Sequence, residues 1–204
     1  MPTSGSESPE MDEVQATILN ALMALNEKPN RMDVSTLLTD GGETRSNVIE
    51  FVPPDRKRIV SEEEGVEYII VDGVVYAKTE DSGGWMKTQI AASTFIQETD
   101  VTEESVAETI SEARFLRTDT LDGMPVYVYS YNSSAGTADI EIENLIELWV
   151  GAQDGLPYKM YMDGEILSAW TNPSTGKSEL LAVRAQTTTL IEFDDSLTIE
   201  PPIP

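Results

Sequence analysis

Carboxylates are the side chains of this sequence that are best placed to do chemistry. Three Glu stand together at 62–64 and two Asp at 194–195, and paired carboxylates can bind a hard cation or serve as an acid and a base. Such pairs also arise by chance, because 37 of the 204 residues are Asp or Glu. We therefore interpret both groups as solvated turns. The segment DGGETRSN (40–47) lacks the regular ligand spacing and the closing Glu of a calcium loop.

Other catalytic chemistries lack the residues that they need. The chain has no Cys and no His, which excludes thiol catalysis, disulfides, Cys/His zinc sites and an imidazole base. Ser93, Ser133 and Ser134 therefore have no His to activate them, and none lies in a Gly-x-Ser-x-Gly turn. No glycine-rich phosphate loop occurs. We expect a protein that is not an enzyme, with no catalytic residue, no metal site and no cofactor.

The charge balance narrows the class of partner. The chain has 13 Lys and Arg, 37 Asp and Glu, and a formal net charge of −24. We expect no nucleic acid partner, because that affinity comes largely from basic groups that neutralise phosphates, and no charge-driven docking on anionic lipid. Lys57 and Arg58 are interpreted as charges on a strand face, not as a phosphate site. No apolar run approaches the ~20 residues of a membrane span.

The N-terminal residues predict a tether followed by a helix. MPTSGSESPE is polar from its first residue and rich in Ser, Pro and Gly, which indicates a flexible tether over 1–9 rather than a signal peptide. Ser8 and Pro9 suit the N-cap and the first helical position. Apolar residues then recur at spacings of three and four, so we expect a helix that is buried on more than one side. These residues are Met11, Val14, Ile18, Leu22 and Leu25, with Leu19 and Met23 beside them.

Residues 31–90 predict an antiparallel meander. Five short segments rich in β-branched and aromatic residues alternate with turn signals about every ten residues. Asp72-Gly73, between VEYIIV and VVYAKT, is the clearest two-residue hairpin in the chain. The expected strands are 32–38, 45–52, 56–60, 66–71 and 74–79.

A second helix and further strands are expected after residue 100. Asp100 and Glu103 have the spacing of a capping box. The apolar and acidic side chains of 138–150 largely alternate, which is typical of an antiparallel sheet with one packed face. The helical stripe would consist of Val106, Ala107, Ile110 and Ala113. The expected strands are 113–121, 125–132, 138–150, 157–162, 179–193 and 196–202.

These elements favour an α+β fold in one domain over 10–204. The economical arrangement is a strongly curved antiparallel β-sheet, an incomplete barrel, with two main helices covering its concave face. Sheet side chains alone need not fill such an interior, so either the helices or a ligand must do so. The chain has eight Met, an adaptable side chain that suits irregular acyl chains. We expect a cavity of a few hundred Å³ or more, the size of small-molecule sites, between the first helix and 140–150 and 158–162.

Four stretches of the chain resemble the LolA-like lipoprotein-carrier superfamily, which includes LolA, LolB and LppX/LprG-type lipoproteins. The order of the stretches along the chain carries the resemblance, because each stretch by itself is a common turn sequence with no catalytic signature. The resemblance implies an incomplete antiparallel barrel with helices across its mouth. The stretches are VQATILNALMAL, FVPPDRKRIV followed by GVEYIIVDGVVYAKTEDSGGWMK, LWVGAQDGLPYKMYM, and TTTLIEFDDSLTIEPP.

The resemblance also implies a function. It predicts an extracytoplasmic protein, in the periplasm or on the outer face of the cell membrane, that holds a lipid or the acyl chain of a lipoprotein in a hydrophobic cavity. We expect a monomer, with any lipid anchor upstream of residue 1. The alternative is a non-carrying envelope interaction or sensor module whose core is filled by its own side chains. The residues expected to line the cavity are Val14, Ile18, Leu22, Leu25, Val106, Ile110, Ile142, Ile146, Leu148, Val150, Tyr158, Met160 and Met162.

One feature of the classical soluble carriers has no evident counterpart. An Arg inside their barrel is associated with the helical lid, and the sequence does not single out an equivalent. This departure bears on active lipoprotein shuttling more than on lipid binding. The arginines of this chain are Arg31, Arg45, Arg56, Arg58, Arg114, Arg117 and Arg184.

Overall fold

The helices and strands alternate much as the sequence predicts. The computed structural model describes residues 8–39, 41–92, 103–136, 141–171 and 178–203, and in these ranges the chain forms two α-helices and one antiparallel sheet of eleven strands. The elements are α1 (Ser8–Glu27), β1 (Asn30–Leu38), β2 (Glu43–Val52), β3 (Arg56–Ser61), β4 (Val66–Val71), β5 (Val74–Thr79), β6 (Met86–Lys87), α2 (Glu103–Thr109), β7 (Ile110–Leu121), β8 (Met124–Gly136), β9 (Glu141–Gly151), β10 (Pro157–Thr171) and β11 (Ser178–Phe193). A short 3₁₀ turn (Glu80–Ser82) precedes β6.

The first helix, α1, is buried on more than one side, as its broad apolar surface predicts. The side chain of Asn30, the first residue of β1, holds its C-terminal end. Its Nδ2 donates to the carbonyl oxygens of Leu25 at 2.8 Å and Lys28 at 2.9 Å, which satisfies carbonyls that a helix end leaves without partners. The buried residues of α1 are Ile18, Leu19, Ala21 and Ala24.

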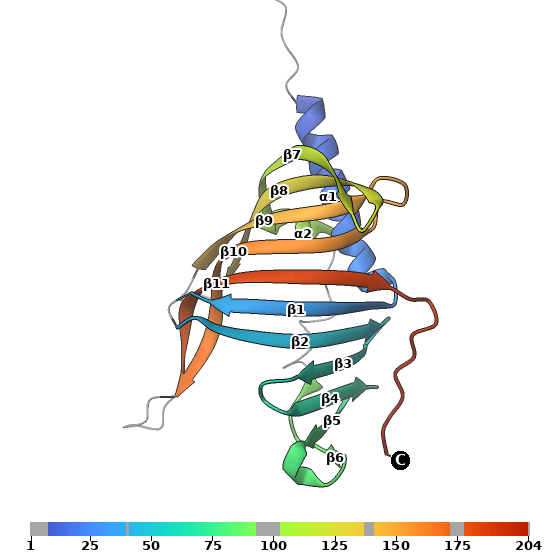
Figure 1. Ribbon diagram of the computed structural model, residues 1–204, viewed down its shortest axis with the longest axis vertical. Helices are drawn as coiled ribbons and strands as arrows, with labels where there is room; N and C mark the ends of the chain where they lie inside the picture. Colours follow the sequence, from blue (N-terminus) through green and yellow to red (C-terminus); the bar gives the residue numbers. More distant parts are fainter. Residues whose placement is uncertain (1–7, 40, 93–102, 137–140, 172–177, 204) are drawn as a thin grey trace, which may run out of the picture.

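The sheet joins the two halves of the chain. Its strand order is β6-β5-β4-β3-β2-β1-β11-β10-β9-β8-β7, so the N-terminal meander β1–β6 meets the C-terminal meander β7–β11 where β1 pairs with β11. Among the described strands, β6 and β7 are the two edges, and the sheet curves without closing into a barrel (Figure 1). The predicted α+β fold, a curved and incomplete antiparallel barrel with two helices, is therefore confirmed.

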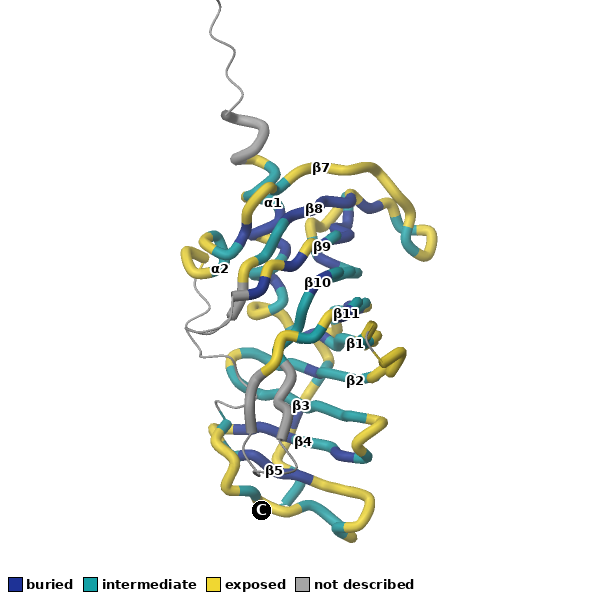
Figure 2. The backbone as a smooth tube through the Cα atoms, turned by 90° about the vertical axis from the view of Figure 1, so that its left-hand side faces the viewer, coloured by how far each residue is buried: buried dark blue, intermediate teal, exposed yellow. Residues whose placement is uncertain are grey.

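The two faces of the sheet are distinguished by the helices. Both helices pack against the β7–β10 part of the sheet (Figure 2), and we call this side the concave face and the opposite side the outer face. Because successive side chains of a strand point to opposite faces, the pairing register assigns each strand residue to one of them. The outer face carries two apolar clusters of its own. One contains Val126, Val128 and Trp149, and the other contains Ile69, Val71 and Tyr76.

The second helix is shorter than predicted. It ends at Thr109, and Ile110 and Ala113, which the spacing assigns to the helix, belong to β7. Ile110 already pairs with β8, and Glu112 has φ of +52° beside a bulge, a backbone that no α-helix contains. The spacing misleads because Ile110 reaches the same apolar cluster from a strand. Asp100, the other half of the predicted capping box, lies outside the described residues.

The strand predicted over 196–202 does not form. After Phe193 the described chain runs without regular structure along the outer face, where Ile199 is buried in the cluster of β4 and β5. Arg56 holds it there, since Nη1 donates to the carbonyl oxygen of Ile199 at 3.0 Å and pairs with Oε1 of Glu200 at 3.1 Å. The two prolines that follow have no N–H to donate, so this segment cannot continue a strand ladder.

Candidate ligand-binding face

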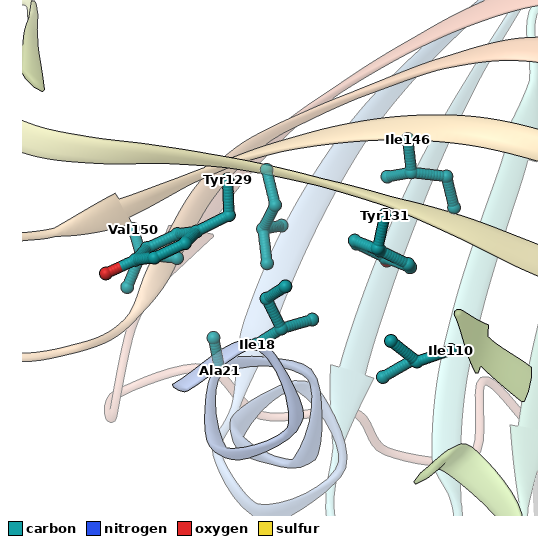
Figure 3. Packing of buried hydrophobic residues seen from close by; sticks show 8 residues of the cluster. Ile18, Ala21, Ile110, Tyr129, Tyr131, Ile146 and Val150 are labelled. Carbon is teal, nitrogen blue, oxygen red and sulfur yellow. The ribbon is translucent and has the colours of Figure 1, made fainter. Parts of the chain in front are cut away.

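The contact between α1 and the sheet gathers most of the predicted lining residues. Figure 3 shows Ile18 and Ala21 of α1 pointing toward Tyr129 and Tyr131 of β8. Ten of the thirteen predicted residues belong to this cluster. Five are buried, namely Ile18, Ile110, Ile146, Leu148 and Val150, and five are half-buried and pack against them, namely Val14, Leu22, Val106, Met160 and Met162.

The other three predicted residues lie apart from this cluster. Ile142 is buried farther along β9, and Leu25 is half-buried near the end of α1. Tyr158 lies at the start of β10, where its ring meets that of Phe193 edge-on with centroids 6.3 Å apart. Its hydroxyl donates to Oδ2 of Asp154 at 2.6 Å. Tyr158 therefore closes a turn, and a second role for it in ligand binding stays a prediction.

Three buried residues of the cluster are not among the predicted lining residues. They are Ala21 of α1 and the two tyrosines of β8, Tyr129 and Tyr131. The tyrosines carry a signal that could have found them, because the alternation of PVYVYSYN puts them on one face of a strand. Burial raises the pKa of Tyr131 well above its ordinary value, so this phenol stays neutral among apolar neighbours.

The helix and the sheet are in direct contact at the centre of this cluster. Ile18 and Leu148 are both 0% exposed, so side chains of the protein fill the space between α1 and β9. Two cavities lined by described residues lie elsewhere. One of about 420 Å³ lies at the ends of β3, β4 and β5, and one of about 340 Å³ lies against β1, β2 and β11. A cavity between α1 and the strands stays a prediction.

The concave face continues beyond the helices as a half-buried apolar surface. Thr189 of β11 pairs with Met160 of the cluster and with Val34 of β1, so the face that α1 covers runs on into the N-terminal meander. There, a row of paired residues crosses four strands, and each of its members is half-buried. The row consists of Met32, Ile49, Ile59 and Tyr68. We call it the apolar row.

A lysine stands next to the apolar row on the same face. Lys57 of β3 pairs with Phe51 of β2 and Ile70 of β4, and Ile70 is fully buried. The Lys57 ammonium lies 6.0 Å from the centre of the Phe51 ring. Burial lowers the pKa of Lys57 below its ordinary value, because an apolar surrounding disfavours the charged form. The interpretation of Lys57 as a strand-face charge is thus correct, and the face is the concave one.

The neighbouring Arg58 points the other way. On the outer face it donates to Glu67 at 2.6 Å and to Glu50 at 3.1 Å, while Arg31 reaches Glu50 from the other side at 3.5 Å. Glu50 is itself buried. The alternation of β3 therefore sends Arg58 into an ion-pair network and Lys57 toward the apolar row.

None of the arginines in the described residues takes the inner place of the arginine in the classical carriers. Each has a polar partner at a strand end or on the outer face, and Arg45, which the register places on the concave side, is exposed near the end of β2. The partners are Asp33 and Glu50 for Arg31, Glu43 for Arg45, Ile199 and Glu200 for Arg56, Glu50 and Glu67 for Arg58, Ser130 for Arg114, Asp119 and Glu147 for Arg117, and Asp163 for Arg184.

The grouped carboxylates behave as turn residues. Glu63 accepts from the backbone N–H of Ser46 at 2.6 Å, and Asp194 accepts from the hydroxyl of Ser196 at 2.6 Å and its backbone N–H at 2.9 Å. These bonds lower the pKa of Asp194. Among the described residues, no group of three or more acidic side chains is arranged to hold a metal ion. Nor does either described helix combine the length and apolar character that crossing a membrane requires.

An open, curved antiparallel sheet with helices across its concave face is also the fold of two solved structures, LppX and LprF, and agrees with the fold that the resemblance predicts. The lipoprotein LppX of Mycobacterium tuberculosis superposes with a TM-score of 0.59 at 11% identity, over 93% of this chain and 99% of its own. LprF from Mycobacterium bovis does so with a TM-score of 0.57 at 14% identity, over 97% and 99%. No family model matches the sequence, and no curated protein matches it significantly. At these identities the likeness establishes the fold alone.

Proposed function

We propose that this protein binds a lipid, or the acyl chain of a lipoprotein, on its concave face outside the cytoplasm. The observation that carries the proposal is the apolar row, Met32, Ile49, Ile59 and Tyr68, which stays half-buried although it lies in the interior of the curved sheet. Contact of apolar side chains with water is unfavourable in proportion to their area. An acyl chain on this row would remove that area from water.

The cluster beneath α1 would form the second part of the binding face. Met160 and Met162 stand at its border, half-buried, between the covered strands and β11. Their unbranched side chains adapt to ligands of irregular shape, so a chain lying on the apolar row could continue under α1 as these side chains change rotamer. The ten predicted lining residues that belong to this cluster would then contact the ligand at this end.

The place of action is part of the same proposal. LppX is described as a lipoprotein, and a protein with its fold that acts at a membrane surface would be anchored in the same way. We therefore propose a location in the periplasm or on the outer face of the cell membrane, as a monomer. The acidic surface, with a net charge of −24, would keep such a protein from adhering to anionic lipid headgroups.

Lipid extraction tests the proposal. The protein is purified without detergent and extracted with organic solvent, and the extract is analysed by mass spectrometry. We expect lipid in an amount comparable to that of the protein. Ile49→Gln should lower that amount, because it places an amide in the middle of the apolar row. Val48→Gln is the matched control, since Val48 is half-buried on the outer face of the same strand.

A second candidate function is an interaction or sensor module with a self-filled core. The observation that favours it is the closed packing of Ile18 against the sheet, where Ile18 and Leu148 have no exposed surface. If the extract holds no lipid and added lipid does not bind, the second candidate is supported and the first is excluded.

A further inference from the structure

We propose that Lys57 is the anion-binding point of the concave face, so that the preferred ligand is an amphiphile with one carboxylate or phosphate group. This inference rests on the proposed function and adds the chemistry of the ligand's polar end. Its basis is the position of Lys57 between Phe51 and Ile70. These three residues form the row of paired residues next to the apolar row, on the same face of the sheet.

Among the described residues, the neighbours of Lys57 in the sheet on its own face are apolar. Phe51 and Ile70 flank it across the sheet, and its next neighbour along β3 on this face is Ile59, a member of the apolar row. A half-buried ammonium in such a place has lost part of its hydration, which an anion brought by the ligand would replace. An ammonium also has three donors, so an added anion can join the interactions that Lys57 already makes within the protein.

Two carboxylates on the strands that flank β3 form ion pairs with Arg58. Glu50 and Glu67 lie on the outer face, where Arg58 binds both, at 3.1 and 2.6 Å. They therefore neutralise the outer cation and not the inner one. This alternation of β2, β3 and β4 places the ammonium of Lys57 on the same face as the surface on which an acyl chain would lie.

The geometry matches the two ends of an anionic amphiphile. A chain on Met32, Ile49 and Ile59 would bring its headgroup to the neighbouring register position, which is that of Lys57. Carboxylate and phosphate both form charge-assisted hydrogen bonds with an ammonium, and these are stronger than bonds between neutral groups. With a net charge of −24, the protein as a whole repels anions, so the preference must come from this local contact.

Three ligands with the same twelve-carbon chain test the proposal: laurate, dodecyl phosphate and dodecanol. Their affinities are measured by displacement of an uncharged fluorescent lipid from the full chain, below the concentration at which they form micelles. We expect the two anions to bind about tenfold more tightly than the alcohol, the scale of a hydrogen bond to a charged group. Lys57→Met should reduce both anions to the affinity of the alcohol and leave the alcohol unchanged.

Two further variants separate the local contact from general effects. Lys57→Arg retains the charge and should keep the preference, whereas Lys87→Met removes one exposed lysine on β6 and should behave as the unmodified protein. Should Lys57→Met fail to fold by circular dichroism, Lys57→Gln takes its place. Preference for one anion or for both supports the proposal and identifies the headgroup. Equal affinity for all three ligands, or a preference that survives Lys57→Met, overturns it, while binding of none overturns the proposed function itself.

Discussion

The hydroxyl of Tyr158 donates a 2.6 Å hydrogen bond to Oδ2 of Asp154 across the turn between β9 and β10. The other carboxylate oxygen of Asp154 accepts from the backbone N–H of Leu156 at 3.0 Å. Gly155 has φ of +71°, a conformation that glycine adopts without strain. Asp154 therefore fastens both the turn and the strand that follows it, which explains why this turn carries an Asp-Gly pair.

This contact predicts that the phenol of Tyr158 ionises at a higher pH than an ordinary tyrosine. Burial, followed by the hydrogen bond and the charge of Asp154, raises the pKa of Tyr158 to about 12 from 10.0. The folded state thus holds this proton more tightly than the unfolded state, and its stabilising effect is present below pH 10 and lost as the pH rises toward 12. Phenolate absorbance during an alkaline titration measures it. Tyr158→Phe should remove a phenol that ionises near pH 12; loss of one that ionises at the ordinary value would contradict the prediction.

The parts of the fold that could be predicted are those set by short-range patterns. The spacing of apolar residues places α1, and Asp72-Gly73 places the β4–β5 hairpin, because each pattern is satisfied within its own element. The end of α2 could not be predicted in this way. Ile110 lies in the spacing of a helical stripe, and its pairing with β8 depends on a strand whose position only the tertiary structure fixes.

The candidate site was predictable to a similar degree. Alternation along 138–150 indicates that Ile146, Leu148 and Val150 share a covered face, and the structure places all three in one cluster. The same alternation is silent on which face of β3 is concave, so it could not reveal that Lys57 points inward. That direction depends on the pairing of β1 with β11, which joins the inner face of β2, β3 and β4 to the face that α1 covers and connects residues far apart in the sequence.

Loss of the buried carboxylate of Glu50 should destabilise the protein more than loss of an exposed one. Glu50→Gln removes the charge that Arg31 and Arg58 share, and because Glu50 is buried we expect a loss of about 1–3 kcal/mol in the free energy of unfolding. Glu43→Gln is the control, since the Glu43–Arg45 pair is exposed and should contribute about 0–1 kcal/mol. Urea denaturation measures both. Equal effects of the two substitutions would contradict the importance of the buried network.

At Gly164 the backbone of β10 lies so close to Asn144 of β9 that there is no room for a side chain. A Cβ at this position would collide with Oδ1 of Asn144 and lie 3.0 Å from its Cα, and that oxygen accepts from the backbone N–H of Glu165 at 2.7 Å. Gly164→Ala should therefore destabilise the protein by about 1–3 kcal/mol, the usual cost of overpacking. Gly84→Ala is the matched control, because an added Cβ there meets nothing within 4 Å. A Gly164→Ala protein with an unchanged unfolding midpoint would refute the close approach.

The stability lost when Ile18 is shortened should measure how strongly α1 is packed against the sheet. Its side chain is fully buried among β8 and β9 residues, so Ile18→Ala should reduce the free energy of unfolding by about 2–5 kcal/mol if α1 stays in place and a cavity remains. Leu190→Ala, at a position that is 49% exposed, should change it far less. The two variants are compared by urea denaturation. A small effect of Ile18→Ala would mean that α1 leaves the sheet at little cost, and added lipid should then restore more stability to this variant than to the unmodified protein, because ligand binding to the folded state stabilises it.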